Sequence, residues 1–175
     1  MGTDATRDHS RMGGGTMDQT VQRTSADVLM DATRFTFKAI CGSDPVVVDG
    51  APEEPETSSV QGIIAVVGDL SWSLSLSFPP KTAEAIARKF SGFHIAYDSA
   101  DMNDVIGELA NVMAGDVVAR LDRLGHKVKM SLPTVARGTG VHMIHPGAEA
   151  LSRFCIRLPQ GQAWVGLAMG KGNNA

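Results

Sequence analysis

Residues 60–78 read VQGIIAVVGDLSWSLSLSF, and this stretch predicts a β-hairpin. Its first part, 60–68, is almost continuously apolar, which is typical of a strand in the middle of a sheet. Its second part, 70–78, alternates between apolar residues and the serines from Ser71 to Ser77, so one face should meet a core. The apolar positions are Leu70, Trp72, Leu74, Leu76 and Phe78. The tight Gly68-Asp69 pair favours an antiparallel turn between the two parts.

A helix and a short strand are predicted before this hairpin. Apolar residues recur at helical spacing from about 21 to 40, with Ser25 or Asp27 as the N-cap. The apolar positions of this helix are Val28, Leu29, Ala32, Phe35 and Ala39. PVVV at 45–48 predicts a short strand, and the acidic, proline-rich residues 50–58 predict a solvated loop.

Two helices follow the hairpin. Pro79-Pro80 ends the strand, and residues 81–92 predict a short helix closed by Gly92. A long helix is predicted from about 102 to 124, with Gly125 as its C-cap.

Three more strands complete the domain. Residues 126–138, HKVKMSLPTVARG, alternate again, with Val128, Met130 and Leu132 on one face. Residues 153–159 and 162–170 predict a last hairpin. The order suggests an α+β fold in which a helix-plus-three-strand unit occurs twice, with helices packed on a mainly antiparallel sheet.

The composition is that of one globular domain. The chain has 175 residues, of which 43% are hydrophobic and 20% charged. A net charge of -3, no long basic run and 5% aromatic residues argue against nucleic acid as a partner. No apolar run approaches the roughly 20 residues of a membrane span, so we expect a cytoplasmic protein with no membrane partner. Residues 1–17 and 171–175 predict flexible tails around a domain at 18–170.

The long helix carries an unusual polar stripe within DVIGELANVMAGDVVARLDRLG, residues 104–125. At about 100° per residue, five positions share the face opposite Leu109 and Met113. They are Asp104, Glu108, Asn111, Gly115 and Asp122. An amide can hold a water while contacting a second group, a carboxylate can pair with a cation, and a mid-helix glycine leaves room for another molecule. The stripe therefore favours the positioning of a hydrolytic water, although a plain solvated face is a common alternative.

This motif resembles that of the CheX-like branch of the CheC/CheX/FliY chemotaxis phosphatases. The resembling residues are DVIGELANVMAG at 104–115 and LGHKVKMSLPTVARGTG at 124–140. In the family motif a helix bears Glu, then Asn three residues on, then Gly four further, which here are Glu108, Asn111 and Gly115. The resemblance is strong over about 101–140, and the order of elements extends it over about 20–170.

The resemblance implies a phosphatase that acts on the aspartyl-phosphate of a CheY-like receiver domain. It implies that Asn111 orients the attacking water and that Glu108 pairs with the receiver's active-site lysine, with Asp104 and Gly115 at the docking face. It also implies that the receiver supplies the Mg²⁺, so the chain needs no cofactor of its own. The alternative is a scaffold that binds a receiver or a flagellar switch protein without catalysis.

The resemblance also bears on the number of sites and on assembly. CheC-like members have two motifs, but the first helix here offers only Asp31 and Arg34 at that spacing, and the short helix offers Glu84 and Ala87. One site is therefore expected, as in CheX-like proteins. Those are typically homodimers built by joining sheets, and a polar-faced edge strand formed by the serine row would allow this.

The remaining motifs favour structural roles. His142 and His145, with His126, are expected in a loop without a carboxylate or cysteine cluster, which disfavours a metal site. Arg137-Gly138-Thr139-Gly140 lacks the Lys-Ser/Thr and helix of a phosphate loop, so we expect a flexible turn. Asp116 and Arg120 are expected to pair on the helix surface. Cys41 and Cys155 are expected to be reduced, buried thiols.

Overall fold

The predicted hairpin lies in the interior of the sheet. In the computed structural model, which describes residues 19–48, 57–141, 143, 145 and 147–170, β2 (Ser58–Gly68) and β3 (Ser71–Phe78) pair antiparallel. Trp72, Leu74 and Leu76 are buried, as the alternation predicts.

The other elements extend this hairpin in both directions. They are α1 (Gln19–Cys41), β1 (Val46–Val47), α2 (Pro80–Ser91), α3 (Ala100–Arg123), β4 (Val128–Met130), β5 (Thr134–Thr139), β6 (Ala150–Leu158) and β7 (Gly161–Gly170). The strand order is β1-β6-β7-β3-β2-β4, with β5 also paired to β2. Every one of these pairings is antiparallel. The predicted α+β class is confirmed, and the predicted tails, 1–17 and 171–175, lie outside the described residues, as does most of the acidic loop at 50–58.

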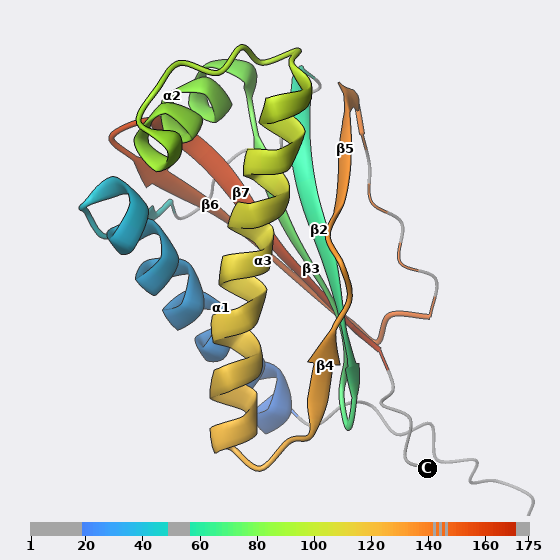
Figure 1. The fold of residues 1–175 in the computed structure, drawn as a ribbon. Coiled ribbons are helices and arrows are strands. Elements are labelled where there is room, and N and C mark those ends of the chain that lie inside the picture. Colours follow the sequence, from blue (N-terminus) through green and yellow to red (C-terminus); the bar gives the residue numbers. More distant parts are fainter. Residues whose placement is uncertain (1–18, 49–56, 142, 144, 146, 171–175) are drawn as a thin grey trace, which may run out of the picture.

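All three helices lie on one face of the sheet, and α3 runs along the strands beside β2, β4 and β5 (Figure 1). The core lies between this helix layer and the sheet. Its largest fully buried side chains come from both layers, and they include Phe37, Phe78, Ile64, Leu74, Ile106 and Met113. This arrangement leaves the outer face of α3 on the surface of the molecule.

The buried face of α1 differs from the predicted one. Phe35 is 57% exposed, whereas Thr33 and Phe37 are fully buried. Phe37 packs edge-on against Phe78, with ring centroids 6.2 Å apart. The Thr33 hydroxyl donates a hydrogen bond of 2.7 Å to the Leu29 carbonyl, which satisfies its polar group inside the core. The prediction placed Phe35 on the buried face, and it was wrong because packing against Phe78 selects Phe37 for the core instead.

The start of α1 and its last apolar residue were also predicted wrongly. The helix already includes Gln19, so Ser25 and Asp27 lie inside it and cannot be its N-cap. Ala39 is exposed.

The stretch that follows α3 is two strands and not one. Between the pairs Val66–Met130 and Ile63–Thr134, β2 has the two residues 64–65 and the opposite strand has the three residues 131–133. One extra residue on one strand is a β-bulge. Pro133 lacks an N–H for the ladder, which explains why the regular pairing stops here. The predicted common face breaks at this point, since Leu132 is 89% exposed.

The serine-faced strand is not an edge strand. β3 lies between β7 and β2, so the expected edge at 70–78 is wrong. Strands of an antiparallel sheet are ordered by hairpin connections and by the helices that cover them, which the alternation of a single strand does not encode. The homodimer stays a prediction, and joining of sheets would have to use β1 or the edge formed by β4 and β5.

Candidate functional site

α3 is fixed at its first turn by a capping residue. Ser99 is the N-cap, and its hydroxyl accepts a hydrogen bond of 3.3 Å from the Met102 N–H. At the other end Leu124 is the C-cap and Gly125 follows with φ 91°, so the helix ends one residue earlier than predicted. A capped helix of this length holds side chains one turn apart in a fixed relation.

α3 packs closely on β2 because this strand has a glycine beneath the helix. A Cβ at Gly62 would lie 2.9 Å from the Cβ of Ala110 and 2.9 Å from the carbonyl oxygen of Ile106. Such distances are shorter than ordinary van der Waals contact. The missing side chain at Gly62 therefore sets the depth of the helix on the sheet.

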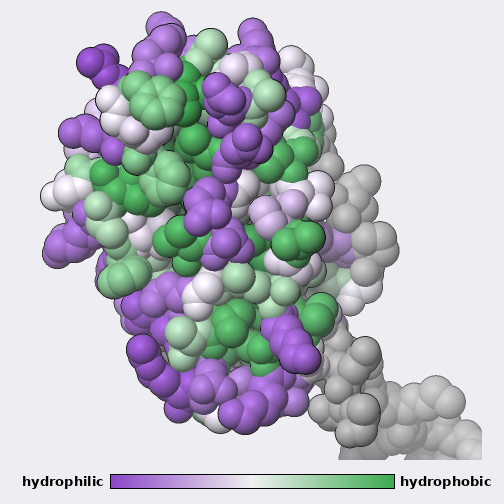
Figure 2. All heavy atoms as spheres, viewed as in Figure 1, coloured by the Kyte–Doolittle hydropathy of each residue, from purple (hydrophilic) through white to green (hydrophobic). Residues whose placement is uncertain are grey.

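The outer face of α3 carries the predicted stripe. Asp104, Glu108 and Asp122 are exposed, and Asn111 and Gly115 are half-buried. Leu109 and Met113, on the opposite side, are buried in the core. The prediction of the two faces is therefore confirmed, and Figure 2 shows this side of the molecule, where hydrophilic groups lie between hydrophobic ones.

The polar side chains in the first half of the stripe have no partners among the described residues. Neither Glu108 nor Asn111 makes a side-chain hydrogen bond or an ion pair there, and Asp104 makes no ion pair. The second half differs, because Asp122 pairs with Lys127 at 2.8 Å, and this hydrogen bond lowers the pKa of the Asp122 carboxyl. The unpaired groups are free to bind another molecule.

Gly115 leaves the stripe open. A Cβ at this position would meet no atom within 4 Å outside the helix's own backbone. Nothing in the packing therefore requires glycine, although glycine costs about 1 kcal/mol relative to alanine inside a helix. The residue leaves room above the helix for another surface.

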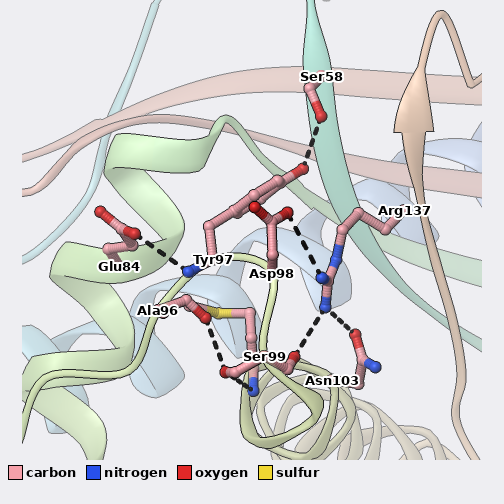
Figure 3. Close-up of polar contacts among 9 residues, drawn as sticks. Ser58, Glu84, Ala96, Tyr97, Asp98, Ser99, Asn103 and Arg137 are labelled. Atoms are coloured by element: carbon pink, nitrogen blue, oxygen red, sulfur yellow. Dashed lines mark hydrogen bonds and ion pairs between the residues drawn. The ribbon is translucent and has the colours of Figure 1, made fainter.

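Arg137 ties the start of α3 to the sheet, and its segment is not the predicted turn. The residue belongs to β5, opposite Val60 of β2. Its Nη2 donates to the Ser99 carbonyl at 3.0 Å and to the side-chain oxygen of Asn103 (Figure 3). The expected flexible turn is wrong for residues 137–139, which pair with β2 and continue the strand pattern predicted over 126–138.

Two further contacts complete this cluster. The Arg137 guanidinium lies 5.2 Å from the centre of the Tyr97 ring and 3.8 Å from an Asp98 carboxylate oxygen. The Tyr97 hydroxyl lies 3.0 Å from the Ser58 hydroxyl, and the Tyr97 N–H donates to the Glu84 carboxylate at 3.0 Å (Figure 3). The cluster thus joins β5, β2, α2 and the N-terminus of α3.

We expect Arg137→Met to lower the free energy of unfolding by about 2 kcal/mol, because hydrogen bonds to a charged group are lost in a half-buried setting. Urea denaturation measures this. Arg123→Met, at the exposed end of α3, is the matched control and should leave stability nearly unchanged. Equal stability of the two variants would contradict this role for Arg137.

Asp31 and Glu84, the acidic residues at which a second motif was considered, make contacts within the molecule. Asp31 pairs with Arg120 at 3.5 Å, and Arg120 also pairs with Asp116 at 2.6 Å, which confirms the predicted helix pair. Glu84 accepts the hydrogen bond from the Tyr97 N–H. Both carboxylates are therefore engaged inside the molecule, unlike Glu108.

Other groups in the described part of the chain offer no competing reactive centre. Cys41 and Cys155 are free thiols, and burial raises the pKa of each above its ordinary value, which disfavours the reactive thiolate. No three His, Cys, Asp or Glu side chains among the described residues gather as metal ligands would. A cavity of about 240 Å³, lined by Ser75, Trp164 and Leu151 among others, lies away from the stripe.

Among the residues that the structure describes, every helix is too short or too polar to cross a lipid bilayer.

Comparison with known sequences gives two matches. The family model for the chemotaxis phosphatase CheX matches residues 60–157, which include α3, the bulge and most of the sheet. The CheY-P phosphatase CheX of Thermotoga maritima is 33% identical over 82 residues. That match covers 46% of this chain and 52% of the relative, so it spans about half of each protein.

Solved structures with the same fold include chemotaxis proteins. CheX from Vibrio vulnificus has a TM-score of 0.72 at 19% identity, covering 83% of this chain and 95% of that one. CheX in a CheX–CheY–BeF3–Mg²⁺ complex from Borrelia burgdorferi has a TM-score of 0.67 at 18% identity, covering 84% and 98%. At these identities the likeness shows a shared fold.

Proposed function

The chain belongs to the family of the chemotaxis phosphatase CheX, and from this premise we propose that it hydrolyses the aspartyl-phosphate of a CheY-like receiver domain. The observation that carries the proposal is the free Glu108–Asn111 pair on an exposed, rigidly held helix face. The CheX–CheY complex from Borrelia burgdorferi supports a receiver as the partner.

In the proposed reaction Asn111 positions the attacking water. A carboxamide can accept a hydrogen bond from the water and donate one to a neighbouring oxygen, which aligns the water with the phosphorus atom. Phosphoryl transfer requires mainly such positioning and charge stabilisation. The half-buried setting of Asn111 limits the directions that the amide can take.

Glu108 and Asp104 act in docking. Both carboxylates are exposed, and neither has an ion pair with a described residue, so each can accept a cation from the partner. Glu108 lies one turn from Asn111, so a lysine bound to Glu108 would lie beside the reacting group. The Mg²⁺ belongs to the receiver, where it would stabilise the charge on the transferred phosphoryl group.

The proposal is tested with phosphorylated receiver domains from the same genome. We expect loss of phosphate from at least one receiver to accelerate when the wild-type protein is added at substoichiometric concentration. Binding without acceleration would contradict the proposed hydrolysis and support the alternative, a scaffold that docks on the receiver. The free amide at Asn111 favours the enzyme, since docking alone does not need a water-positioning group there.

Gly115 provides a second prediction, with alanine and leucine as a matched pair. Gly115→Ala should raise the free energy of unfolding by up to about 1 kcal/mol because alanine is the better helix former. Gly115→Leu should also fold, since no atom outside the helix backbone lies within 4 Å of the added Cβ. The larger side chain should nevertheless hinder docking and reduce kcat/KM for the receiver at least about tenfold, or about 1.4 kcal/mol. Unchanged kcat/KM for Gly115→Leu would show that no partner surface approaches this position.

A further inference from the structure

Leu132 is the most exposed large hydrophobic side chain among the described residues. It is 89% exposed, compared with 69% for Leu151 and 61% for Phe93. A single exposed leucine is common on protein surfaces. This leucine, however, lies in a bulge beside α3, close to the candidate site.

The backbone of the bulge is held by specific hydrogen bonds. The Ser131 N–H donates to the Ala65 carbonyl at 2.8 Å, and the Ser131 hydroxyl accepts from the Ala65 N–H at 3.1 Å. The same hydroxyl lies 2.8 Å from the Leu132 carbonyl and donates to it. Ser131 thus satisfies the backbone on both sides of the interruption, and the peptide at Leu132 is held in place.

The bulge also decides which side chain faces outward. With unbroken alternation from Val128 and Met130, Leu132 would lie on the helix side of the sheet. The extra residue instead moves Pro133 to that side, where its ring lies 3.6 Å from the position of a Cβ on Gly107 of α3. Bulges re-aim side chains in this way and occur often beside functional sites.

This contact places Leu132 next to the candidate site. Gly107 directly precedes Glu108 and lies four residues before Asn111, so Pro133 packs against the turn that carries the pair. Leu132 is bonded to Pro133 and lies at the sheet edge beside this turn. On the helix itself, Val112 follows Asn111 and is 38% exposed. Apolar surface therefore lies beside the polar pair.

We propose that Leu132 is an anchor that inserts into an apolar patch of the receiver domain, beside the receiver's phosphorylation site. The inference rests on the proposed function and deepens it. Charge and apolar contact act together here, since the free carboxylates of Asp104 and Glu108 attract the receiver's cation and Leu132 fixes the orientation. Burying an exposed leucine at such an interface corresponds to roughly a 10- to 100-fold gain in affinity.

The test measures binding and turnover separately. Binding of Leu132→Ala to a receiver held in its active form by beryllofluoride and Mg²⁺ should weaken about tenfold or more. KM for the phosphorylated receiver should rise to the same extent, and kcat should stay unchanged because no group at the reacting centre is altered. Leu132 is almost fully exposed, so the variant should fold as the wild type does.

Leu151→Ala is the matched control. Leu151 is 69% exposed on β6, which lies three strands, or roughly 14 Å, from β2. Its replacement should change neither binding nor kinetics. Binding of Leu132→Ala within twofold of wild type, or an equal loss in Leu151→Ala, overturns the proposal.

The outcomes also separate this proposal from the proposed function. In one outcome, the wild-type protein binds the activated receiver without accelerating hydrolysis, and Leu132→Ala fails to bind. This result rejects the proposed phosphatase activity and supports Leu132 as an anchor. Acceleration by wild type and Leu132→Ala with the same KM supports the enzyme and rejects the anchor. A wild-type protein that binds none of the receivers rejects both.

Discussion

Replacement of Asn111 by alanine should reduce the rate of receiver dephosphorylation by about 10²–10³, which corresponds to roughly 3–4 kcal/mol of transition-state stabilisation. The loss should appear in kcat, because positioning of the water matters only in the transition state. Binding of the activated receiver should remain near wild type. The helix itself should be unharmed, since alanine is the better helix former. Single-turnover loss of phosphate at saturating protein measures this effect.

Two companion variants make this result interpretable. Glu108→Ala should weaken binding as well as rate, because it removes the proposed partner of the receiver's lysine. Asp122→Ala, nearly four turns from Glu108 on the same face and paired with Lys127, should leave the rate nearly unchanged. A folded Asn111→Ala protein with wild-type acceleration would reject the catalytic assignment and leave the scaffold alternative.

Gly62→Val should produce the largest loss of stability. The added Cβ would approach the Ile106 carbonyl oxygen to 2.9 Å, and a backbone atom of a packed helix cannot move aside as the end of a side chain can. Overpacking of a core typically costs about 1–3 kcal/mol, and a clash with backbone falls at the upper end. We expect a decrease of about 3 kcal/mol in the free energy of unfolding by urea denaturation. The displaced α3 should also lower the phosphatase rate of the folded fraction.

Ala65→Val is the matched control on the same strand. Ala65 is half-buried on the opposite face of β2, away from α3. Because valine favours strands, the substitution should change stability by less than about 1 kcal/mol. If Gly62→Val were as stable as Ala65→Val, the close approach of helix and sheet would not limit stability.

Much of the fold could be predicted because its signals are local. The alternation of β3, the turn at Gly68-Asp69 and the helical spacing of α3 depend on residues close together in the chain. The position of Glu108 and Asn111 on one exposed face follows from helix geometry alone. Motif resemblance added the expected chemistry of that face.

Predictions failed where a distant segment decided the outcome. Phe35 and Phe37 are both apolar, and only packing against Phe78 selects Phe37 for the core. Alternation marks β3 as a strand without showing whether it lies at an edge or in the centre. Residues 137–140 were expected to form a turn, but pairing with β2 makes residues 137–139 part of a strand.

The sequence by itself determined the central hairpin, the long helix and the polar stripe of this protein, because a period of 2 or 3.6 residues can be recognised from side chains close together in the chain. Tertiary structure decided which surfaces meet. Gly62 sets the depth of α3 only because Ala110 and Ile106, more than forty residues away, lie above it. Leu132 faces solvent only because β2 pairs with both β4 and β5 in registers that differ by one residue. Register is a property of two strands together, so neither strand's sequence contains it.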